Sequence, residues 1–367
     1  MTRGTIPMVK LSGTPGERGF QHGQALAEAI ERFYHRWIAE NAAATPPVHE
    51  RDVLAYAMSH LPESRAYAPD LVEEVDGIAA GAKLPFEKVW LLNCFDEADG
   101  YALYRRVNAG RLCTTFVATG LSTKDGTTYM GQTWDAREWY EPVMLQIEPG
   151  HGEIGVLMFT HPGVVAGTGI NAAGLAIVWN TLRCLDARNG VPCTFLIRKA
   201  LQQTKLSDAM FATVSGVRAA GFNFIIGADF GAVNVEATAT KERVRYVGRH
   251  LGHANHYEEP ELLQFEGHPA ADPPGTTRIR AGRMNQLLDQ AAGQIDLERC
   301  KQILSDHANY PASICRHKDL PKCDFFSRAV ILYALGQGLM LVTAGPACEN
   351  PWMEYRMPRS AGVQPPR

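Results

Sequence analysis

The side chain with the clearest chemical use is the thiol of Cys113, in the sequence Leu112-Cys113-Thr114-Thr115. A thiol becomes a strong nucleophile only after a base has taken its proton. If the peptide bond before Cys113 were cleaved, this residue would carry a free α-amino group next to its own thiol. Such an amine has a pKa of ~7.7–8.0 and is partly neutral near neutral pH, so it can act as the base. We therefore predict that Cys113 starts inside a precursor and ends as the nucleophilic first residue of a mature chain.

Other polar side chains follow β-rich segments and can assist this nucleophile. Asp135 ends the run 129–135, and its carboxylate can hold or orient the amine of Cys113. Acyl transfer also needs hydrogen-bond donors for the developing oxyanion, each worth ~3 kcal/mol. The side-chain amides of Asn255 and Asn180 are the candidates. The alternatives are that Cys113 is a core residue at the start of a strand and that the others are turn or capping residues.

Two further residues are candidates for binding the substrate. Arg316 can bind a carboxylate of the substrate or support Asp135, and its alternative is a structural or surface arginine. Trp134 lies next to Asp135 and favours a bulky or aromatic substrate group. Ser327 is a weaker candidate for the same site.

The sequence offers little support for a metal or a cofactor. His250, His253 and His256 have metal-like spacing, but no carboxylate or cysteine joins them at ligand spacing, so we interpret them as structural. The eight cysteines match no common zinc-binding pattern. Most of them are expected to be small buried hydrophobic residues, Cys348 included. Phosphate-loop and serine-hydrolase motifs are lacking as well. We therefore expect neither a metal nor a cofactor.

The composition excludes several classes of function. The chain has 367 residues, of which 46% are hydrophobic and 20% charged, as is typical of a globular protein with a real core. Its net charge of −3 gives no electrostatic case for binding nucleic acid or an anionic membrane. No apolar run reaches the ~18–20 residues needed to span a bilayer, and the first residues lack the apolar segment of a secretory signal. We expect a cytoplasmic protein that acts on a small molecule.

The elements that must position these residues change in kind near Cys113. Residues before it show helical periodicity, for example over 24–42 and 69–82. Residues after it are β-rich, with hairpins expected around 124–126 and around 171–174, where strands over 164–169 and 175–180 flank the turn. Helices return, and two last strands follow. This order predicts an α+β fold with two antiparallel sheets covered by helices on their outer faces. Since no break in composition separates two folding units, we expect one domain over residues 1–367.

These motifs together resemble a known family. Cys113-Thr114-Thr115 followed by Gly131-Gln132-Thr133-Trp134-Asp135 is similar to the acyl-coenzyme A:6-aminopenicillanic-acid acyltransferase (isopenicillin N acyltransferase) family, also called peptidase family C45, within the N-terminal-nucleophile hydrolases. The resemblance runs almost from end to end. Its other segments are 17–23, 169–180, 253–257, 313–317 and 345–351.

The resemblance implies an αββα sandwich and self-cleavage between Leu112 and Cys113. The products would be an α chain of residues 1–112 and a β chain of residues 113–367, which stay associated. One departure is Leu112 itself, because the family commonly has glycine before the nucleophile and a branched side chain there could slow cleavage. Gln132 lies where the related bile-salt hydrolases carry an arginine, so bile-salt specificity is not expected.

Three functions fit these features. The first is a self-processed amidohydrolase that cleaves a small N-acyl compound through an acyl-thioester on Cys113. The second is an acyltransferase that uses the same thioester, with acyl-CoA as donor and an amine as acceptor. Residues at the nucleophile cannot distinguish these two, since water and amine compete for one intermediate. The third is a binding protein or pseudoenzyme that keeps the fold but is never cleaved, an option that Leu112 leaves open.

Overall fold

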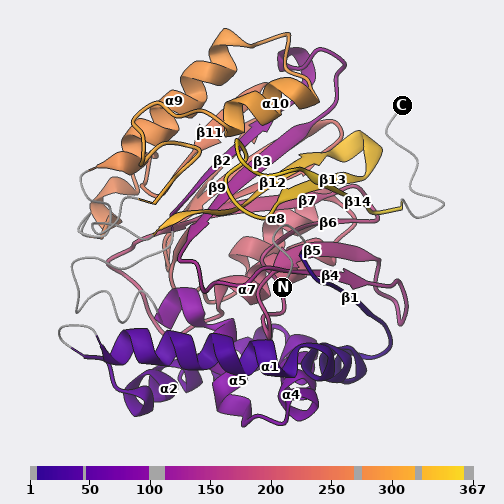
Figure 1. The fold of residues 1–367 in the computed structure, drawn as a ribbon, viewed down its shortest axis with the longest axis vertical. Coiled ribbons are helices and arrows are strands. Elements are labelled where there is room, and N and C mark those ends of the chain that lie inside the picture. Colours follow the sequence, from indigo (N-terminus) through magenta and orange to yellow (C-terminus); the bar gives the residue numbers. More distant parts are fainter. Residues whose placement is uncertain (1–5, 44–46, 99–111, 268–274, 319–324, 359–367) are drawn as a thin grey trace.

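The computed structural model describes residues 6–43, 47–98, 112–267, 275–318 and 325–358. Two β-sheets lie face to face in the middle of the molecule, and helices cover the outer face of each (Figure 1). From the bottom of Figure 1 upward, the layers are helices, an eight-stranded sheet, a six-stranded sheet and helices. This order of layers confirms the predicted αββα sandwich.

The larger sheet has the strand order β1-β4-β5-β6-β7-β8-β9-β10. Its strands are β1 (Met8–Leu11), β4 (Val143–Ile147), β5 (Val156–Thr160), β6 (Thr168–Asn171), β7 (Ala176–Leu182), β8 (Gly221–Ala228), β9 (Gly231–Ala237) and β10 (Glu242–Val247). The predicted hairpin around residues 171–174 is present, because β6 and β7 pair antiparallel on either side of it. However, β6 begins at Thr168, later than expected. The sheet is also not wholly antiparallel as predicted, since β1 at its edge runs parallel to β4.

The smaller sheet carries Cys113 and has the order β11-β2-β3-β12-β13-β14. Its strands are β11 (His250–His253), β2 (Leu112–Ala118), β3 (Tyr129–Ala136), β12 (Phe326–Ala334), β13 (Leu339–Thr343) and β14 (Met353–Arg356). The predicted hairpin between β2 and β3 is present, and the two strands pair antiparallel from Leu112 opposite Asp135 to Ala118 opposite Tyr129. The register therefore brings the two ends of the predicted site together.

The helices fall into two groups. One group lies on the side of the larger sheet and comprises α1 (Pro15–Ala42), α2 (Glu50–Met58), α3 (Leu61–Tyr67), α4 (Pro69–Ala82), α5 (Phe86–Asn93), α7 (Cys193–Leu201) and α8 (Leu206–Val214). The other group covers the smaller sheet and comprises α9 (Thr276–Gln290) and α10 (Leu297–Leu304). The helical periodicity seen before Cys113 is thus confirmed in α1 to α5.

The helices α1 and α4 pack unusually closely because glycines face the partner backbone. A Cβ atom added at Gly19 would lie 2.0 Å from the carbonyl oxygen of Glu74, and one added at Gly81 would lie 2.2 Å from that of Phe20. Real Cβ contacts are never this short, so only glycine allows this separation of the helices. The segment 17–23, one of the motifs found in the sequence, therefore has a packing role in the helical layer.

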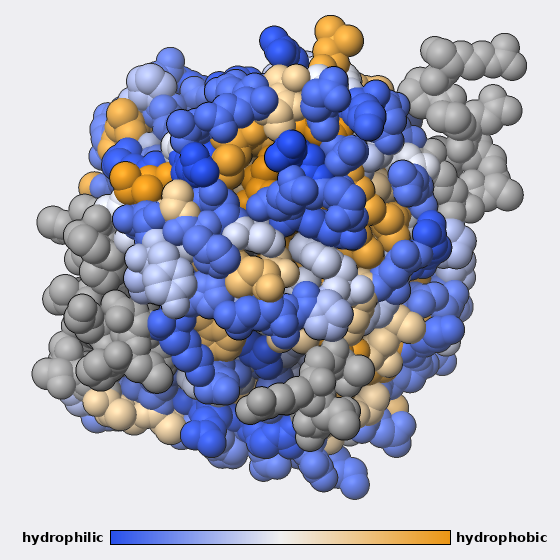
Figure 2. All heavy atoms as spheres, turned by 45° about the horizontal axis from the view of Figure 1, so that its top comes forward, coloured by the Kyte–Doolittle hydropathy of each residue, from blue (hydrophilic) through white to orange (hydrophobic). Residues whose placement is uncertain are grey.

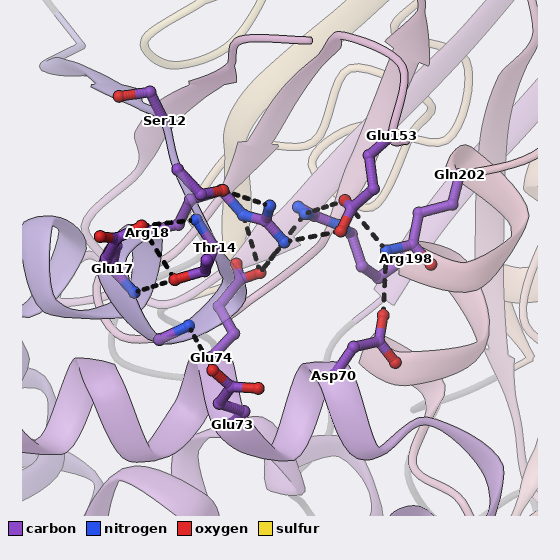
Figure 3. Close-up of polar contacts among 12 residues, drawn as sticks. Ser12, Thr14, Glu17, Arg18, Asp70, Glu73, Glu74, Glu153, Arg198 and Gln202 are labelled. Carbon is purple, nitrogen blue, oxygen red and sulfur yellow. Dashed lines mark hydrogen bonds and ion pairs between the residues drawn. The ribbon is translucent and has the colours of Figure 1, made fainter. Parts of the chain in front are cut away.

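A cluster of buried charges ties this helical layer to the rest of the chain (Figure 3). Arg18 of α1 lies 3.1 Å from both Glu74 of α4 and Glu153 of the β4–β5 connection. Arg198 of α7 lies 3.4 Å from the same Glu74 oxygen. Two arginines thus face two glutamates, and only Glu153 has a side chain that is appreciably exposed. Arg18 and Glu74 precede Cys113 in the chain, whereas Glu153 and Arg198 follow it.

The surface is mixed in character. Figure 2 shows hydrophilic residues over most of one face, with smaller hydrophobic areas between them. Among the residues that the structure describes, no helix combines the length and the apolar character that a membrane crossing requires.

Candidate active site

Cys113 lies at the start of β2, on the side of the smaller sheet that faces the larger one. Side chains alternate along a strand, and the alternation is visible here. Val117 packs into the core between the sheets, whereas Phe116 packs into the core under α9 and α10. Cys113 shares the face of Val117, and its residue is only 6% exposed. The thiol is therefore held between the two sheets.

Two asparagine amides converge on this thiol. The Nδ2 atoms of Asn180, on β7, and of Asn255, just after β11, each donate to Cys113 Sγ at 3.3 Å. The thiol in turn donates to the carbonyl oxygen of Trp179 at 3.4 Å. The three residues come from both sheets, so the sandwich itself assembles the surroundings of the sulfur.

The hydrogen bonds around each amide fix which of its ends faces the sulfur. Asn255 Oδ1 accepts from the backbone N–H of Cys113 at 2.9 Å and from Arg280 at 3.0 Å, and both partners can only donate. Asn180 Nδ2 donates to the carbonyl oxygen of Cys113 at 3.2 Å, a partner that can only accept, while its Oδ1 accepts from the hydroxyl of Thr115 at 2.7 Å. The NH₂ group of each asparagine must therefore be the end that points toward Cys113.

Arg280 is the residue of this site that sequence reasoning missed. It lies on α9, is 1% exposed, and donates to the carbonyl oxygen of Cys113 at 2.7 Å as well as to Asn255. One signal in the sequence could have indicated it. Arg280, Met284 and Leu288 recur at helical spacing and are all buried, so a charged residue stands within an apolar stripe. A buried charge in such a position usually has a partner.

The environment makes Cys113 a weak acid in the uncleaved chain. Burial raises the pKa of its thiol, and the charge of Asp135 acts in the same direction. The hydrogen bonds from Asn255 and Asn180 and the positive charge of Arg280 oppose this effect without overcoming it. The thiol is therefore protonated near neutral pH and needs a base before it can attack.

Asp135 lies beside the bond between Leu112 and Cys113 but does not contact the sulfur. It is opposite Leu112 in the β2–β3 pairing, and its Oδ1 accepts from Ser327 at 2.8 Å. Its Oδ2 has no hydrogen-bond partner among the described residues although it is buried. Burial raises the pKa of this carboxyl, against the opposing charges of Arg280 and Arg316. The predicted contact between Asp135 and the nitrogen of Cys113 is not made in this uncleaved chain, where the nitrogen donates to Asn255.

Arg316 and Ser327 stand behind Asp135 and form a small unit with it. The backbone N–H of Arg316 donates to the hydroxyl of Ser327 at 3.0 Å, and the N–H of Ser327 donates back to the carbonyl of Arg316 at 3.0 Å. Arg316 is 4% exposed, and the charge of its guanidinium acts on Asp135. Of its two predicted roles, support of Asp135 is the one that this charge and the link through Ser327 favour.

Trp134 forms part of an aromatic wall next to Cys113. It is paired with Cys113 across β2 and β3, and its ring packs edge-on against Trp179 at 5.5 Å between centroids. Gln132 donates to the carbonyl of Trp179 at 2.9 Å and accepts from its backbone N–H at 3.2 Å. The side chain of Gln132 therefore holds the two sheets together beside the thiol.

The three spaced histidines have separate partners. His253 lies 3.1 Å from Glu236 in a fully buried ion pair, and Glu258 is close enough to join them as a possible metal ligand. The sequence showed no carboxylate at ligand spacing from these histidines, and the structure brings in Glu236 from β9, which is distant in the sequence. Glu236 also accepts the backbone N–H groups of Glu258 and Glu259, both at 3.0 Å. This carboxylate thus anchors the segment that carries Asn255.

The arrangement has the parts that acyl chemistry needs. A thiol is held at a fixed position, two amide N–H donors reach the same sulfur, and a buried carboxylate stands next to the bond before the cysteine. A carbonyl carbon attached to this sulfur would place its oxygen within reach of those donors.

Known proteins match this chain over most of its length. Residues 121–333, more than half of the chain, match the family described as AAT, acyl-coenzyme A:6-aminopenicillanic acid acyl-transferase. The 40 kDa form of acyl-coenzyme A:6-aminopenicillanic-acid-acyltransferase from Emericella nidulans is 30% identical over 321 residues, which cover 84% of each chain. An uncharacterized protein of Archaeoglobus fulgidus is 25% identical over 347 residues, which cover 81% of this chain and 57% of that one.

Two solved structures resemble the fold at low sequence identity. A mutant of conjugated bile acid hydrolase from Clostridium perfringens has a TM-score of 0.45 and 13% identity, covering 68% of this chain and 99% of that one. Penicillin V acylase from Agrobacterium tumefaciens has a TM-score of 0.46 and 11% identity, covering 67% of this chain and 86% of that one. The family match and the 30% identical relative show the family of this chain without these two structures. The chain belongs to the acyl-coenzyme A:6-aminopenicillanic acid acyl-transferase family and is an enzyme that acts on amide C–N bonds.

Proposed function

We propose that this protein is a self-processed amidohydrolase that cleaves a small N-acyl compound through an acyl-thioester on Cys113. The observation that carries the proposal is the convergence of Asn180 Nδ2 and Asn255 Nδ2 on Cys113 Sγ, both at 3.3 Å. No cofactor is needed for this chemistry.

Processing comes first in this account. The thiol of Cys113 attacks the carbonyl carbon of Leu112, and the C–N bond breaks as the thiol proton passes to the departing nitrogen. A thioester then joins Leu112 to Sγ, and Cys113 carries a free amine. Water then hydrolyses the thioester, which gives a carboxylate on Leu112 and restores the thiol. Asp135 pairs with Leu112 across β2 and β3, and in this account its Oδ2, which has no hydrogen-bond partner among the described residues, binds the new amine. Its negative charge raises the pKa of that amine, which makes the neutral amine a stronger base.

Turnover uses the same sulfur. The amine of Cys113 takes the thiol proton, the thiolate attacks the acyl carbonyl, and the amine returns the proton to the departing nitrogen. The NH₂ groups of Asn255 and Asn180 stabilise the oxyanion. Arg280 keeps Asn255 in the correct orientation through its bond to Oδ1. Water then attacks the thioester and releases the acid.

The two products of processing are proposed to remain together. Arg18 and Glu74 would belong to the first product, and Glu153 and Arg198 to the second, so the buried charge cluster would cross between them. His22 also makes a contact between the two products, because its Nε2 accepts the backbone N–H of Gly163 at 3.0 Å.

We also propose a cytoplasmic location. The cysteines that the structure describes are free thiols, which agrees with a reducing compartment.

The second candidate is transfer of the acyl group from acyl-CoA to an amine. The observation in its favour is the relative from Emericella nidulans, whose name describes this reaction. The aromatic wall of Trp134 and Trp179 suits an acyl group with a bulky or aromatic end in either reaction.

A panel of N-acyl amines, from acetyl through palmitoyl to arylacetyl, tests the proposal. We expect release of free acid, formation of a hydroxamate when hydroxylamine intercepts the thioester, and neither product from Cys113→Ala. Parallel reactions with acyl-CoA esters and acceptor amines measure transfer. Faster formation of an N-acyl product than of acid would favour the acyltransferase. Turnover that survives in Cys113→Ala would overturn both candidates.

A further inference from the structure

A second cluster of reactive side chains lies outside the site around Cys113. His307 and Cys315 belong to the segment between α10 and β12, His317 follows two residues later, and Cys348 comes from the segment between β13 and β14. One ligand atom of each residue lies within 4.8 Å of those of all the others. Cys348 is exposed, contrary to the expectation of a buried hydrophobic cysteine.

Four of the six separations within this cluster are close to those of a tetrahedral metal site. The nitrogens of His307 and His317 are 3.1 Å apart, and the sulfurs of Cys315 and Cys348 are 3.5 Å apart. The sulfurs of Cys315 and Cys348 lie 3.7 and 3.4 Å from Nε2 of His317. Zinc bonds of ~2.3 Å to sulfur and ~2.0–2.1 Å to nitrogen give tetrahedral edges of about 3.3–3.8 Å. Four of the six separations are therefore close to such edges, and the other two, from His307 to the sulfurs, are within 4.8 Å.

The surroundings of His317 add an independent observation. Its Nε2 faces the two sulfurs, while its other ring nitrogen, Nδ1, lies 3.3 Å from a carboxylate oxygen of Glu349. Histidines that bind metals usually place the second nitrogen against a carboxylate, which fixes the ring and its tautomer. Glu349 directly follows Cys348 in the chain, so one segment supplies both a ligand and this support.

We propose that His307, Cys315, His317 and Cys348 bind one zinc ion in a structural Cys₂His₂ site. Four protein ligands leave no open position, which is typical of structural zinc sites. Cys315 and Cys348 bind as thiolates and release their protons to solvent, and the two imidazoles bind as neutral rings. The spacing of the four residues matches no common zinc motif, because two separate segments of the chain contribute them.

The site would hold the segment that carries Arg316. This arginine lies between two of the ligands in the chain, and its backbone exchanges hydrogen bonds with Ser327, which donates to Asp135. A zinc ion would therefore join the β13–β14 connection to the backbone behind Asp135. In this role zinc stabilises the arrangement of the site and takes no part in the reaction.

Cobalt binding to the full-length protein, stripped of metal under reducing conditions, tests the proposal. We expect one Co²⁺ per chain, with the absorption bands of tetrahedral cobalt and a thiolate charge-transfer band, and displacement of the cobalt by one equivalent of Zn²⁺. Glu349→Gln should weaken metal binding ~10-fold. His307→Ala and Cys348→Ser should weaken it more, and Cys348→Ser should also diminish the charge-transfer band. Cys113→Ala should keep the whole spectrum, which excludes the nucleophile as a ligand.

Controls separate metal binding from misfolding. His307 and Cys348 are exposed, so their variants should unfold at the same temperature as the wild type when a chelator is present, and only the wild type should gain stability from zinc. His35→Ala, a change at another exposed histidine, should bind metal as the wild type does. The proposal is overturned if cobalt gives no tetrahedral thiolate spectrum or if the ligand variants bind as tightly as the wild type. A Cys315–Cys348 disulfide in protein purified without air would also overturn it.

Discussion

Two buried polar networks join distant parts of this chain, and they are built in opposite ways. Around Glu74, two arginines face two glutamates, so formal charges neutralise one another between α1, α4 and α7. Around Cys113, the sulfur receives neutral amide N–H groups from Asn180 and Asn255. The first network is made of oppositely charged groups that pair with one another. The second holds a group that must change its protonation state.

The difference indicates what each network is for. Charges that are fully paired in a buried place resist separation, because removal of one partner leaves the other charge buried without compensation. Amides around a thiol stabilise a thiolate or an oxyanion when either forms, yet they allow the neutral state as well. We therefore expect damage to the first network to appear in stability and damage to the second to appear in the reaction rate.

The largest effect on stability should follow Glu74→Gln. This change removes the carboxylate that Arg18 and Arg198 share, so the free energy of unfolding should fall by ~3–5 kcal/mol. Urea unfolding at neutral pH measures it. Glu73→Gln, at the exposed neighbouring position, is the matched control and should change little. A large fall in kcat of the folded Glu74→Gln protein, without a loss of stability, would contradict the division between the networks.

Asn255→Ala should have the converse effect. Loss of one oxyanion donor lowers kcat by about 10²–10³-fold, or ~3 kcal/mol, and the variant should remain folded. Asn285→Ala is a suitable control, because Asn285 holds the backbone of Gly252 on β11 but does not contact Cys113. Steady-state kinetics on the best substrate of the N-acyl panel gives the comparison. Equal rates for the two variants would refute the role of Asn255.

Arg280→Met tests how the second network is oriented. Hydrogen bonds to charged groups contribute ~1.5–3 kcal/mol each, so we expect kcat/KM to fall about 10–100-fold. In the double variant Arg280→Met/Asn255→Ala, the loss caused by Arg280→Met should be smaller than in the wild type, since Arg280 acts partly through Asn255. Arg278→Met, a change at an exposed position of the same helix, serves as control. Full additivity of the two effects would show that Arg280 does not act through Asn255.

The smallest effect should be a dependence of the free energy of unfolding on pH. It comes from His22, which lies near the first network. Burial, with the nearby charge of Arg198, lowers the pKa of His22 to about 3 from its usual 6.5. Between these two values the unfolded state binds a proton that the folded state does not. The free energy of unfolding should therefore fall with falling pH, by up to ~1.4 kcal/mol per pH unit from this residue.

His22→Gln can be compared with the wild type by urea unfolding at pH 7 and pH 5. The glutamine can still accept from Gly163 but does not titrate. The variant should lose less stability than the wild type on acidification. An identical loss in both proteins would mean that His22 is not held neutral as described.

The sequence predicted the layered fold well where the signals are local. Helical periodicity, the two hairpin turns and the order of the elements indicated the αββα sandwich. Pairing between distant segments was not predictable in this way. The strand β1 has only four residues and pairs in parallel with β4 across more than a hundred residues of chain. No local pattern specifies such a partner.

The site was predictable to a similar extent. Cys113, Asn180 and Asn255 come together in the structure as their motifs indicated. Asp135 lies beside the Leu112–Cys113 bond, with Arg316 behind it. The sulfur instead contacts Asn180, Asn255 and Trp179. The helical pattern could have shown that Arg280 is buried but not which residues it contacts, because a helix shows only which face is buried and not what lies against it. Both the Arg280 contact and the His307 cluster depend on tertiary packing.

The central claim is that the bond between Leu112 and Cys113 breaks and that Cys113 then works as a first residue. Intact-mass analysis and N-terminal sequencing of denatured, purified protein test it most directly. We predict two fragments for the wild type, one ending at Leu112 and one starting at Cys113, with masses that sum to the full chain plus one water, and a single chain for Cys113→Ala. An uncleaved wild-type chain that turns over N-acyl substrates would contradict the account.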